Sequence, residues 1–303
     1  MATKIVIDCD PGHDDAIAIL LALASPEVEV VGVTTVSGNQ TLDKTTPNAI
    51  RVLELAGRGD VPVAAGAERP LVRERFVADY VHGETGMDGP ALESPRAQPV
   101  EQHAVDYLAD HVAGATLVPT GPLTNVALML ALHPDARPDR IVLMGGAYGI
   151  GNVTPAAEFN IWADPEAARR VFESGLDVTM IGLDVTHKAL MTRDHAETLR
   201  SSGNVGRFVA ELHDFFSGFH ARTYGSPDSP IHDAVAVAHV VQEGLVETEF
   251  LPVDVDCSWG LGRGRTNADL YGRTGKDPTT HVGVDVDAEA FFELLIPRIA
   301  SLG

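Results

Sequence analysis

The sequence predicts an α/β fold: a single domain with a mainly parallel, mixed central sheet and helices on both faces. The first observation is that short apolar, β-branched runs alternate with longer helical patterns, as in βαβ units. The second is that 45% of the 303 residues are hydrophobic and 21% are charged, which is typical of globular chains. The third is that no linker-like stretch interrupts the pattern, so we expect one domain over residues 1–303.

The expected strands are short apolar runs, and each is followed by a helical pattern or a turn. These strands are expected at residues 4–8, 28–36, 61–65, 116–119, 140–144 and 178–183. The helices are expected at residues 14–24, 41–56, 101–112, 123–132, 165–173, 205–224, from about 233, and at 287–299. Residues 68–99 form a long loop rich in Gly, Pro, Glu and Arg, which indicates a functional or mobile segment. After residue 250 we expect short strands and turns.

The chain is strongly acidic, with a formal net charge of −21. A field of this sign repels phosphate backbones and anionic lipids, so nucleic-acid and membrane partners are disfavoured. It suits neutral small molecules and cations. The two cysteines, Cys9 and Cys257, cannot staple a fold of this size, which favours a reducing, cytoplasmic setting. The longest apolar run, residues 16–24, is too short to span a bilayer.

Polar residues gather after the predicted strands. They occupy residues 9–15, 37–39, 120–125 and 145–160. Ligands of open parallel sheets bind beyond the carboxyl ends of the strands. We therefore expect these four segments to meet at one rim of the sheet and to form a single site.

An acidic cluster follows the first strand: Asp8, Asp10, Asp14 and Asp15 lie within eight residues. Crowded carboxylates repel each other and commonly hold a cation, and oxygen ligands point to Ca²⁺ or Mg²⁺. Asp10 is placed to act as general base for a metal-bound water. In the alternative interpretation, Asp14 and Asp15 only begin a helix and Asp10 caps a turn, which accounts for fewer of the four acids.

A second polar pair, His232 and Asp233, precedes a predicted helix. Histidine can protonate a leaving group near neutral pH, and the neighbouring carboxylate can be a metal ligand. The same pair is also compatible with a simple helix cap. Upstream, Phe216, His220 and Tyr224 are four residues apart and share one helix face. That stripe is compatible with core packing or with the wall of a pocket.

Taken together, these motifs resemble the inosine–uridine-preferring nucleoside hydrolases. Residues 8–15 match that family's N-terminal aspartate signature. The resemblance continues through residues 37–39, 82–84, 120–125, 143–146, 158–161, 164–168, 184–187 and 232–233. It implies a Rossmann-like nucleoside hydrolase fold and an enzyme that cleaves the N-glycosidic bond of ribonucleosides to free base and ribose. It also implies a role in nucleoside salvage and a homo-oligomer, either dimer or tetramer.

The resemblance also assigns the metal and catalytic residues. One Ca²⁺ per subunit is expected on Asp10, Asp15, Asp233 and the backbone carbonyl of Thr124. Asp10 is also expected to be the general base, and His232 the proton donor to the leaving base.

The substrate residues follow by the same resemblance. Those expected to bind or enclose the nucleoside are Asp14, Asn39, His82, Met144, Asn152, Glu158, Phe159 and Asn160. His220 and Tyr224 are a possible base pocket. The presence of His232 favours pyrimidine or broad inosine–uridine use over the purine-specific subgroup, which lacks this histidine.

Two other functions remain open at this point. A haloacid-dehalogenase-like, Mg²⁺-dependent phosphohydrolase also carries Asp-x-Asp after its first strand, with Asp8 as nucleophile and Asp10 as acid. The chain has only four lysines and a large negative charge, which disfavour a phosphate substrate. The other alternative is a catalytically silent protein that binds a nucleoside or ribose. The intact aspartates and His232 argue against it.

Overall fold

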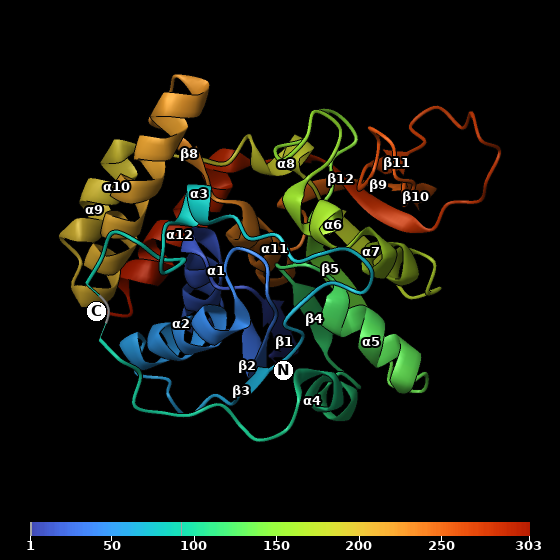
Figure 1. The fold of residues 1–303 in the computed structure, drawn as a ribbon. Helices are drawn as coiled ribbons and strands as arrows, with labels where there is room; N and C mark the ends of the chain where they lie inside the picture. Colours follow the sequence, from blue (N-terminus) through green and yellow to red (C-terminus); the bar gives the residue numbers. More distant parts are fainter. Residues whose placement is uncertain (1, 92) are drawn as a thin grey trace.

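A computed structural model describes residues 2–91 and 93–303 (Figure 1). Its main sheet has eight strands in the order β3-β2-β1-β4-β5-β6-β12-β9. All neighbours in this sheet are parallel except β12 and β9. The strands are β1 (Thr3–Cys9), β2 (Val28–Thr35), β3 (Val63–Ala65), β4 (Thr116–Pro119), β5 (Arg140–Met144), β6 (Val178–Ile181), β9 (Val246–Leu251) and β12 (Thr280–Val286). The predicted α/β class with a mainly parallel, mixed sheet is confirmed.

The strand order reverses between β1 and β4. From β1 the chain builds outward to β2 and β3, and then returns to place β4, β5 and β6 on the other side. At such a switch point the connections leave in opposite directions, so a crevice opens beyond the carboxyl ends of the two central strands. Asp10 follows β1 and Thr120 follows β4, so both lie at this crevice.

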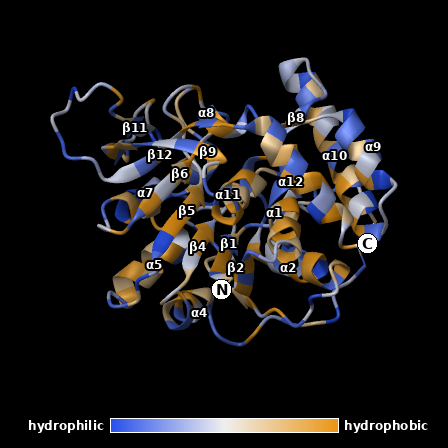
Figure 2. Cartoon of the chain, turned by 180° about the vertical axis from the view of Figure 1, so that it is seen from behind, coloured by the Kyte–Doolittle hydropathy of each residue, from blue (hydrophilic) through white to orange (hydrophobic). Residues whose placement is uncertain are grey.

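Alternation along β1 explains why helices cover both faces of the sheet. Ile5 and Ile7 point to one face and Val6 to the other, because successive strand side chains alternate. The first face packs against α1 (His13–Ala24), α2 (Leu42–Leu55), α10 (Asn204–Tyr224), α11 (His232–Val241) and α12 (Ala288–Ala300). The second packs against α4 (Ala104–His111), α5 (Thr124–Leu132) and α7 (Pro165–Phe172). Figure 2 shows the apolar colouring concentrated in the central strands and α1.

Helix α1 is the central helix of the first face. Ten consecutive residues, from His13 to Ala22, are buried. The helix packs along α11, and the two N-termini lie at the same end of the sheet. This arrangement brings the polar residues that begin both helices to the switch-point crevice.

Shorter elements complete the fold. The two small sheets pair β7 (Leu190–Met191) with β8 (Ser229–Pro230) and β10 (Val253–Val255) with β11 (Thr266–Ala268). The remaining helices are α3 (Asp79–His82), α6 (Phe159–Ala163), α8 (Leu183–Thr186) and α9 (Arg193–Arg200). In the residues described, no helix has both the length and the apolarity needed to cross a bilayer.

The structure differs from the sequence expectation mainly toward the C-terminus. The segment after residue 250 includes β12, which inserts into the main sheet between β6 and β9. The expected strand at 178–183 ends at Ile181, because Leu183 already begins α8. The long loop at 68–99 contains the one-turn helix α3. Helix α2 accommodates Pro47 in its second turn, where only one backbone hydrogen bond of the helix is lost.

We expect Leu20→Ala to lower the free energy of unfolding by about 2–5 kcal/mol, since it opens a cavity beside α11 and the sheet. Leu20 is fully buried in α1. Thermal or urea unfolding measures the change. Leu132→Ala is the matched control: this side chain is 66% exposed at the end of α5, and its loss is expected to change stability by less than about 0.5 kcal/mol.

Candidate active site

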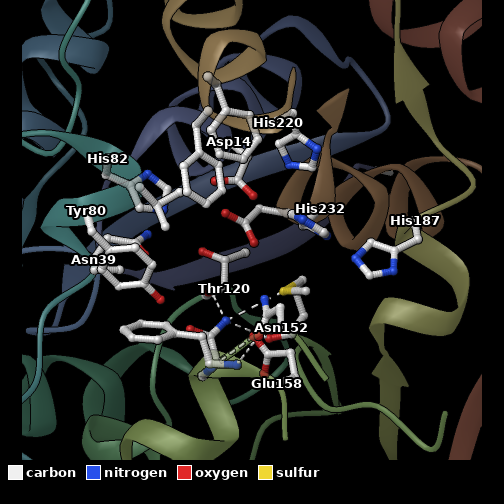
Figure 3. Close-up of a pocket in the computed structure, with 18 of the residues that line it drawn as sticks. Asp14, Asn39, Tyr80, His82, Thr120, Asn152, Glu158, His187, His220 and His232 are labelled. Carbon is white, nitrogen blue, oxygen red and sulfur yellow. Dashed lines mark hydrogen bonds between the residues drawn. The ribbon is translucent and has the colours of Figure 1, made fainter. Parts of the chain in front are cut away.

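A cavity opens at the carboxyl ends of the central strands (Figure 3). Its empty volume is about 730 Å³, part of which is open to solvent. It has an acidic floor near the N-termini of α1 and α11, a polar side on α6, and an aromatic and imidazole side on α3 and α10. The lining residues are Asp14, Asn39, Ala78, Tyr80, Val81, His82, Thr120, Met144, Asn152, Glu158, Phe159, Asn160, His187, Phe216, Phe219, His220, Tyr224, His232 and Asp233.

The acidic floor is formed by three buried carboxylates. Asp14, Asp15 and Asp233 each place a carboxylate oxygen within 4.8 Å of the others. Asp14 and Asp15 stand in the first turn of α1, and Asp233 stands in the first turn of α11. The positive ends of the two helix dipoles therefore face these acids and partly offset their repulsion.

Asp10 and Asp15 are held by backbone and amide donors from three loops. Asp15 accepts hydrogen bonds from the backbone N–H of Gly12 (2.9 Å), from Thr120 Oγ1 (2.9 Å) and from Asn39 Nδ2 (3.0 Å). Asp10 Oδ2 accepts from the backbone N–H of Asn39 at 2.6 Å. Asn39 therefore links the two aspartates and is itself fixed in orientation.

Burial raises the pKa of every acid in this group. Desolvation is the largest cause, and the neighbouring carboxylates add to it for Asp10 and Asp233, whose pKa values are raised well above the usual range. The pKa of Asp14 is raised to about 7, and that of Asp15 is also raised. In the absence of a positive charge, this cluster favours bound protons.

The cluster fits a hard divalent cation. Asp10 Oδ1 is buried and has no hydrogen-bond partner among the residues described. This oxygen is therefore open to coordinate a cation. Gly38 and Gly121 lie against the same carboxylate so closely that a Cβ at either position would collide with it. All candidate ligands are oxygen atoms, which suits Ca²⁺ or Mg²⁺. Thr124, by contrast, uses its hydroxyl to bond Asp164 at 2.7 Å and does not line the cavity.

The polar side of the cavity is preorganised by contacts to backbone atoms. Asn160 Nδ2 donates to the carbonyls of Thr120 (2.7 Å) and Met144 (3.2 Å). The Glu158 carboxylate accepts from the backbone N–H groups of Gly146, Asn160 and Ile161, so it caps α6 while facing the cavity. These bonds fix the amide and carboxylate groups before any ligand arrives.

His232 stands at the start of α11, opposite His82 (Figure 3). Its Nδ1 lies 2.7 Å from the hydroxyl oxygen of Thr186. His187 packs edge-on against it, with ring centroids 5.6 Å apart. Burial, followed by the neighbouring His187 and His220, lowers the pKa of His232 well below its usual range, so its imidazole is neutral near pH 7.

Aromatic rings of α10 form the outer wall. Phe216 packs against His220, and His220 packs against Tyr224, each with ring centroids 4.9 Å apart. The rings of His220 and Tyr224 both line the cavity, which agrees with their spacing of four residues on one helix face. Tyr224 lies at the mouth and is 56% exposed. Burial lowers the pKa of His220 to about 4.

Most of the predicted site residues meet in this cavity. Those that line it are Asp14, Asn39, His82, Met144, Asn152, Glu158, Phe159, Asn160, His220, Tyr224, His232 and Asp233. Asp15, a member of the floor, and Asp10 behind it do not line the cavity directly, and both are in contact with Asn39. Sequence analysis did not name Tyr80, His187 or Phe219 as lining residues, and it included Thr120 only within the rim segment 120–125. Thr120 directly follows β4, and that position was the available signal for it.

Comparisons with known proteins agree with this geometry. Residues 5–293 match the profile of the family described as inosine-uridine preferring nucleoside hydrolase. The chain belongs to this family, and its activity is the cleavage of the N-glycosidic bond of a ribonucleoside. The predicted family and reaction class are therefore confirmed, and the phosphohydrolase alternative is set aside.

Relatives and solved structures extend over the whole chain. A pyrimidine-specific ribonucleoside hydrolase RihA of Salmonella arizonae is 50% identical, with 100% of both chains covered. One of Shewanella sp. (strain MR-7) is 49% identical and covers 99% of this chain and 97% of its own. The purine-preferring ribonucleoside hydrolase from Gardnerella vaginalis superposes with a TM-score of 0.93 at 35% identity, covering 99% of this chain and 98% of its own.

We expect the metal-free protein to lose stability as the pH rises from about 6.5 to 8. The pKa values of Asp8 and Asp14 are raised to about 7 by burial, so the folded chain holds protons that the unfolded chain has already released near pH 4. The slope approaches about 1.4 kcal/mol per pH unit for each such group below pH 7 and falls to zero above it, where both states have released the proton, so each group contributes about 0.8 kcal/mol over this interval. Below pH 6.5 the buried histidines, whose pKa values are lowered by burial, make the stability rise with pH. This change masks the fall in stability that the acids cause.

Urea unfolding at several pH values, with chelator present, measures this slope. Adding saturating Ca²⁺ is the control, since a bound cation keeps the floor carboxylates ionised in the folded state and makes the slope shallower. A flat profile without metal would show that these acids are not protonated by burial.

Proposed function

We propose that this chain is a Ca²⁺-dependent ribonucleoside hydrolase that prefers pyrimidine nucleosides. The observation that carries the proposal is the buried acid floor of Asp14, Asp15 and Asp233, with the unpartnered Asp10 Oδ1 behind it, at one end of the cavity. Two relatives at 49–50% identity over nearly the full chain are pyrimidine-specific by name, which supports the base preference.

The cation is assigned to Asp10, Asp15 and Asp233, while the Thr124 carbonyl stays a ligand that only the family resemblance predicts. The supporting observations are the all-oxygen donor set, the burial of the three aspartates and the missing partner of Asp10 Oδ1. When bound, Ca²⁺ supplies a positive charge that acidifies water and attracts the vicinal hydroxyls of ribose. Its charge also offsets the mutual repulsion of the aspartates.

The ribose is assigned to the polar side of the cavity. The side-chain N–H groups of Asn39 and Asn160 donate to protein acceptors. Their amide oxygens can therefore accept hydrogen bonds from sugar hydroxyls. Asp14 can accept a further hydroxyl. Asn152, Glu158, Phe159 and Met144 complete the enclosure. A 2′-deoxyribose leaves part of this set unpaired, so the site favours ribonucleosides.

Cleavage requires a base at the sugar and an acid at the nucleobase. Asp10 is the proposed general base, since its carboxylate would hold the cation and so lie beside the attacking water, from which it can take a proton. His232 is the proposed acid. With Nδ1 beside the Thr186 hydroxyl, Nε2 is the nitrogen left for the leaving base; a protonated His232 ring gives its Nε2 proton to the base and returns to the neutral form that burial favours. Asp14 and Glu158 face the positive charge that develops on the ribose.

The base subsite is assigned to the α10 wall with His82. Phe216 and Phe219 offer stacking surfaces, and His220 and Tyr224 offer polar tips beside them. The proposed setting is cytoplasmic, which the two free cysteines favour. Three further predictions stay untested: a single domain, a homo-oligomer that is a dimer or tetramer, and a role in nucleoside salvage.

Ribose release from uridine, cytidine, inosine, adenosine and 2′-deoxyuridine tests the proposal, with and without a calcium chelator. We expect chelator-sensitive release that is fastest with the two pyrimidine ribosides and far slower with 2′-deoxyuridine. Asp10→Asn, nearly isosteric, is the matched inactive control and is expected to lose several orders of magnitude in kcat. Chelator-resistant turnover would contradict the metal assignment. Tight binding without ribose release would establish a silent binding protein instead.

His232→Ala is expected to lower kcat on uridine by about 10²–10⁴-fold, because the base then departs unprotonated. The rate on p-nitrophenyl riboside, whose leaving group needs no proton, should change only a few-fold. Thr186→Val keeps the imidazole and removes the hydroxyl beside Nδ1, so we expect a smaller loss with the same substrate pattern. Equal losses on both substrates would remove His232 from the role of acid.

A further inference from the structure

A buried asparagine of α2, Asn48, joins two segments that lie on different sides of the cavity. Its side chain is fully buried, and its Nδ2 donates to the carbonyl oxygens of Pro11 (3.1 Å) and Thr85 (2.9 Å). Pro11 belongs to the turn that follows Asp10, and Thr85 belongs to the segment that follows His82. One amide group therefore ties the turn of the acids to the wall that carries His82.

The orientation of this amide is fixed by its three partners. Both carbonyl oxygens can only accept a hydrogen bond, so they must face the amide nitrogen. The guanidinium of Arg51 can only donate, and its Nη1 lies 2.7 Å from Asn48 Oδ1. Only one orientation of the amide satisfies all three contacts, and in that orientation both of its N–H groups are used.

The segment that follows His82 is also held by a neighbour of Asn48. Just before α2, Gln40 Nε2 donates to the carbonyl oxygens of Gly83 (3.0 Å) and Glu84 (3.1 Å). Gly86, at a φ of +88°, approaches α2 so closely that a Cβ there would lie 3.2 Å from Asn48 Nδ2. The backbone of the segment is therefore docked on α2 and on the residue that precedes it.

The ring of His82 packs directly against the turn of the acids. The backbone nitrogen of His13 lies 3.4 Å from His82 Nδ1, and a Cβ on Gly12 would meet the same ring nitrogen at 2.6 Å. The ring therefore cannot move closer to the turn, but it could move away from it. The bridge through Asn48 opposes that movement, because it holds the backbone on both sides of the contact.

We propose that Asn48 is a positioning residue for nucleoside cleavage, which holds His82 and the wall proposed for the base at a fixed distance from the acid floor. The inference rests on the proposed function for the task of that wall, and deepens it by naming what sets the spacing between the two sides of the site. Asn48 does not line the cavity, whereas His82 does (Figure 3), so the effect of Asn48 passes through His82. A wall that drifts from the floor holds the base less well in the transition state.

Asn48→Leu tests the proposal, because leucine has nearly the same shape but offers neither donor nor acceptor. We expect kcat/KM on the best riboside to fall by at least about fivefold. The inhibition constant of free ribose, which occupies only the sugar side, should change by less than about twofold. In a His82→Ala background, Asn48→Leu should cost less than about twofold more, because the side chain through which it acts is already gone.

Hydrogen exchange, followed by mass spectrometry without substrate, measures the anchoring itself. We expect the amides of residues 83–88 to exchange faster in Asn48→Leu than in the wild type, because two of the contacts that hold this region are lost. This readout needs no turnover. If the wild type releases no ribose from any riboside, the proposed function fails, and the exchange still decides whether Asn48 anchors the wall.

Glu54→Leu is the matched control, because Glu54 anchors the same long loop to the same helix at a point farther from the cavity. Its carboxylate accepts from the backbone N–H groups of Arg96 (2.9 Å) and Ala97 (2.7 Å). We expect Glu54→Leu to leave kcat/KM within about twofold of the wild type and to leave the exchange of residues 83–88 unchanged.

A folded Asn48→Leu variant that loses less than about fivefold in kcat/KM would overturn the inference, and so would an equal loss in the His82→Ala background. If Asn48→Leu does not fold, Arg51→Met replaces it. Arg51 is only partly buried, and this change removes the donor that orients the amide. We then expect a loss of at least about threefold that disappears with His82→Ala, and any other result would count against the positioning role.

Discussion

The crowding of buried carboxylates beyond β1 is the constraint on which the rest of the site depends. Asp10, Asp14, Asp15 and Asp233 are all at least 94% buried, and each raises the cost of ionising the others. Several otherwise unrelated features of the fold offset that cost. The N-termini of α1 and α11 converge on the acids, Asn39 and Thr120 donate to them, and glycines leave room around Asp10. The carboxylate oxygens that these donors leave unpaired can coordinate a cation.

The fold separates the chemistry from the choice of substrate. The acids follow β1 or begin helices packed into the main core, so their positions are fixed by the sheet and by the burial of α1. The wall proposed for the base is built differently, from the one-turn helix α3 inside a long loop and from the last turns of α10, where Tyr224 is half exposed. Substitutions on this outer wall can change which base is accepted without disturbing the acids.

Sequence analysis predicted the features that depend on local pattern, such as strands and motif spacing. It did not predict the features that depend only on tertiary contacts. The strands of the first half and the spacing of Asp10, Asp14 and Asp15 are local signals, and they were predicted correctly. The insertion of β12 between β6 and β9 was not predicted, because strand pairing depends on partners some hundred residues away. For the same reason the contact of Thr186 was not predicted, because its partner, His232, is 46 residues distant.

Burial acts on the two kinds of titratable group in opposite directions, and both results suit glycosidic cleavage. It raises the pKa of the carboxylates and lowers that of the imidazoles, so neither kind is charged on its own. A divalent cation at the floor restores the negative charge of the acids but leaves the imidazoles neutral. The sugar, which becomes positive as the bond breaks, then lies beside anions and away from other cations.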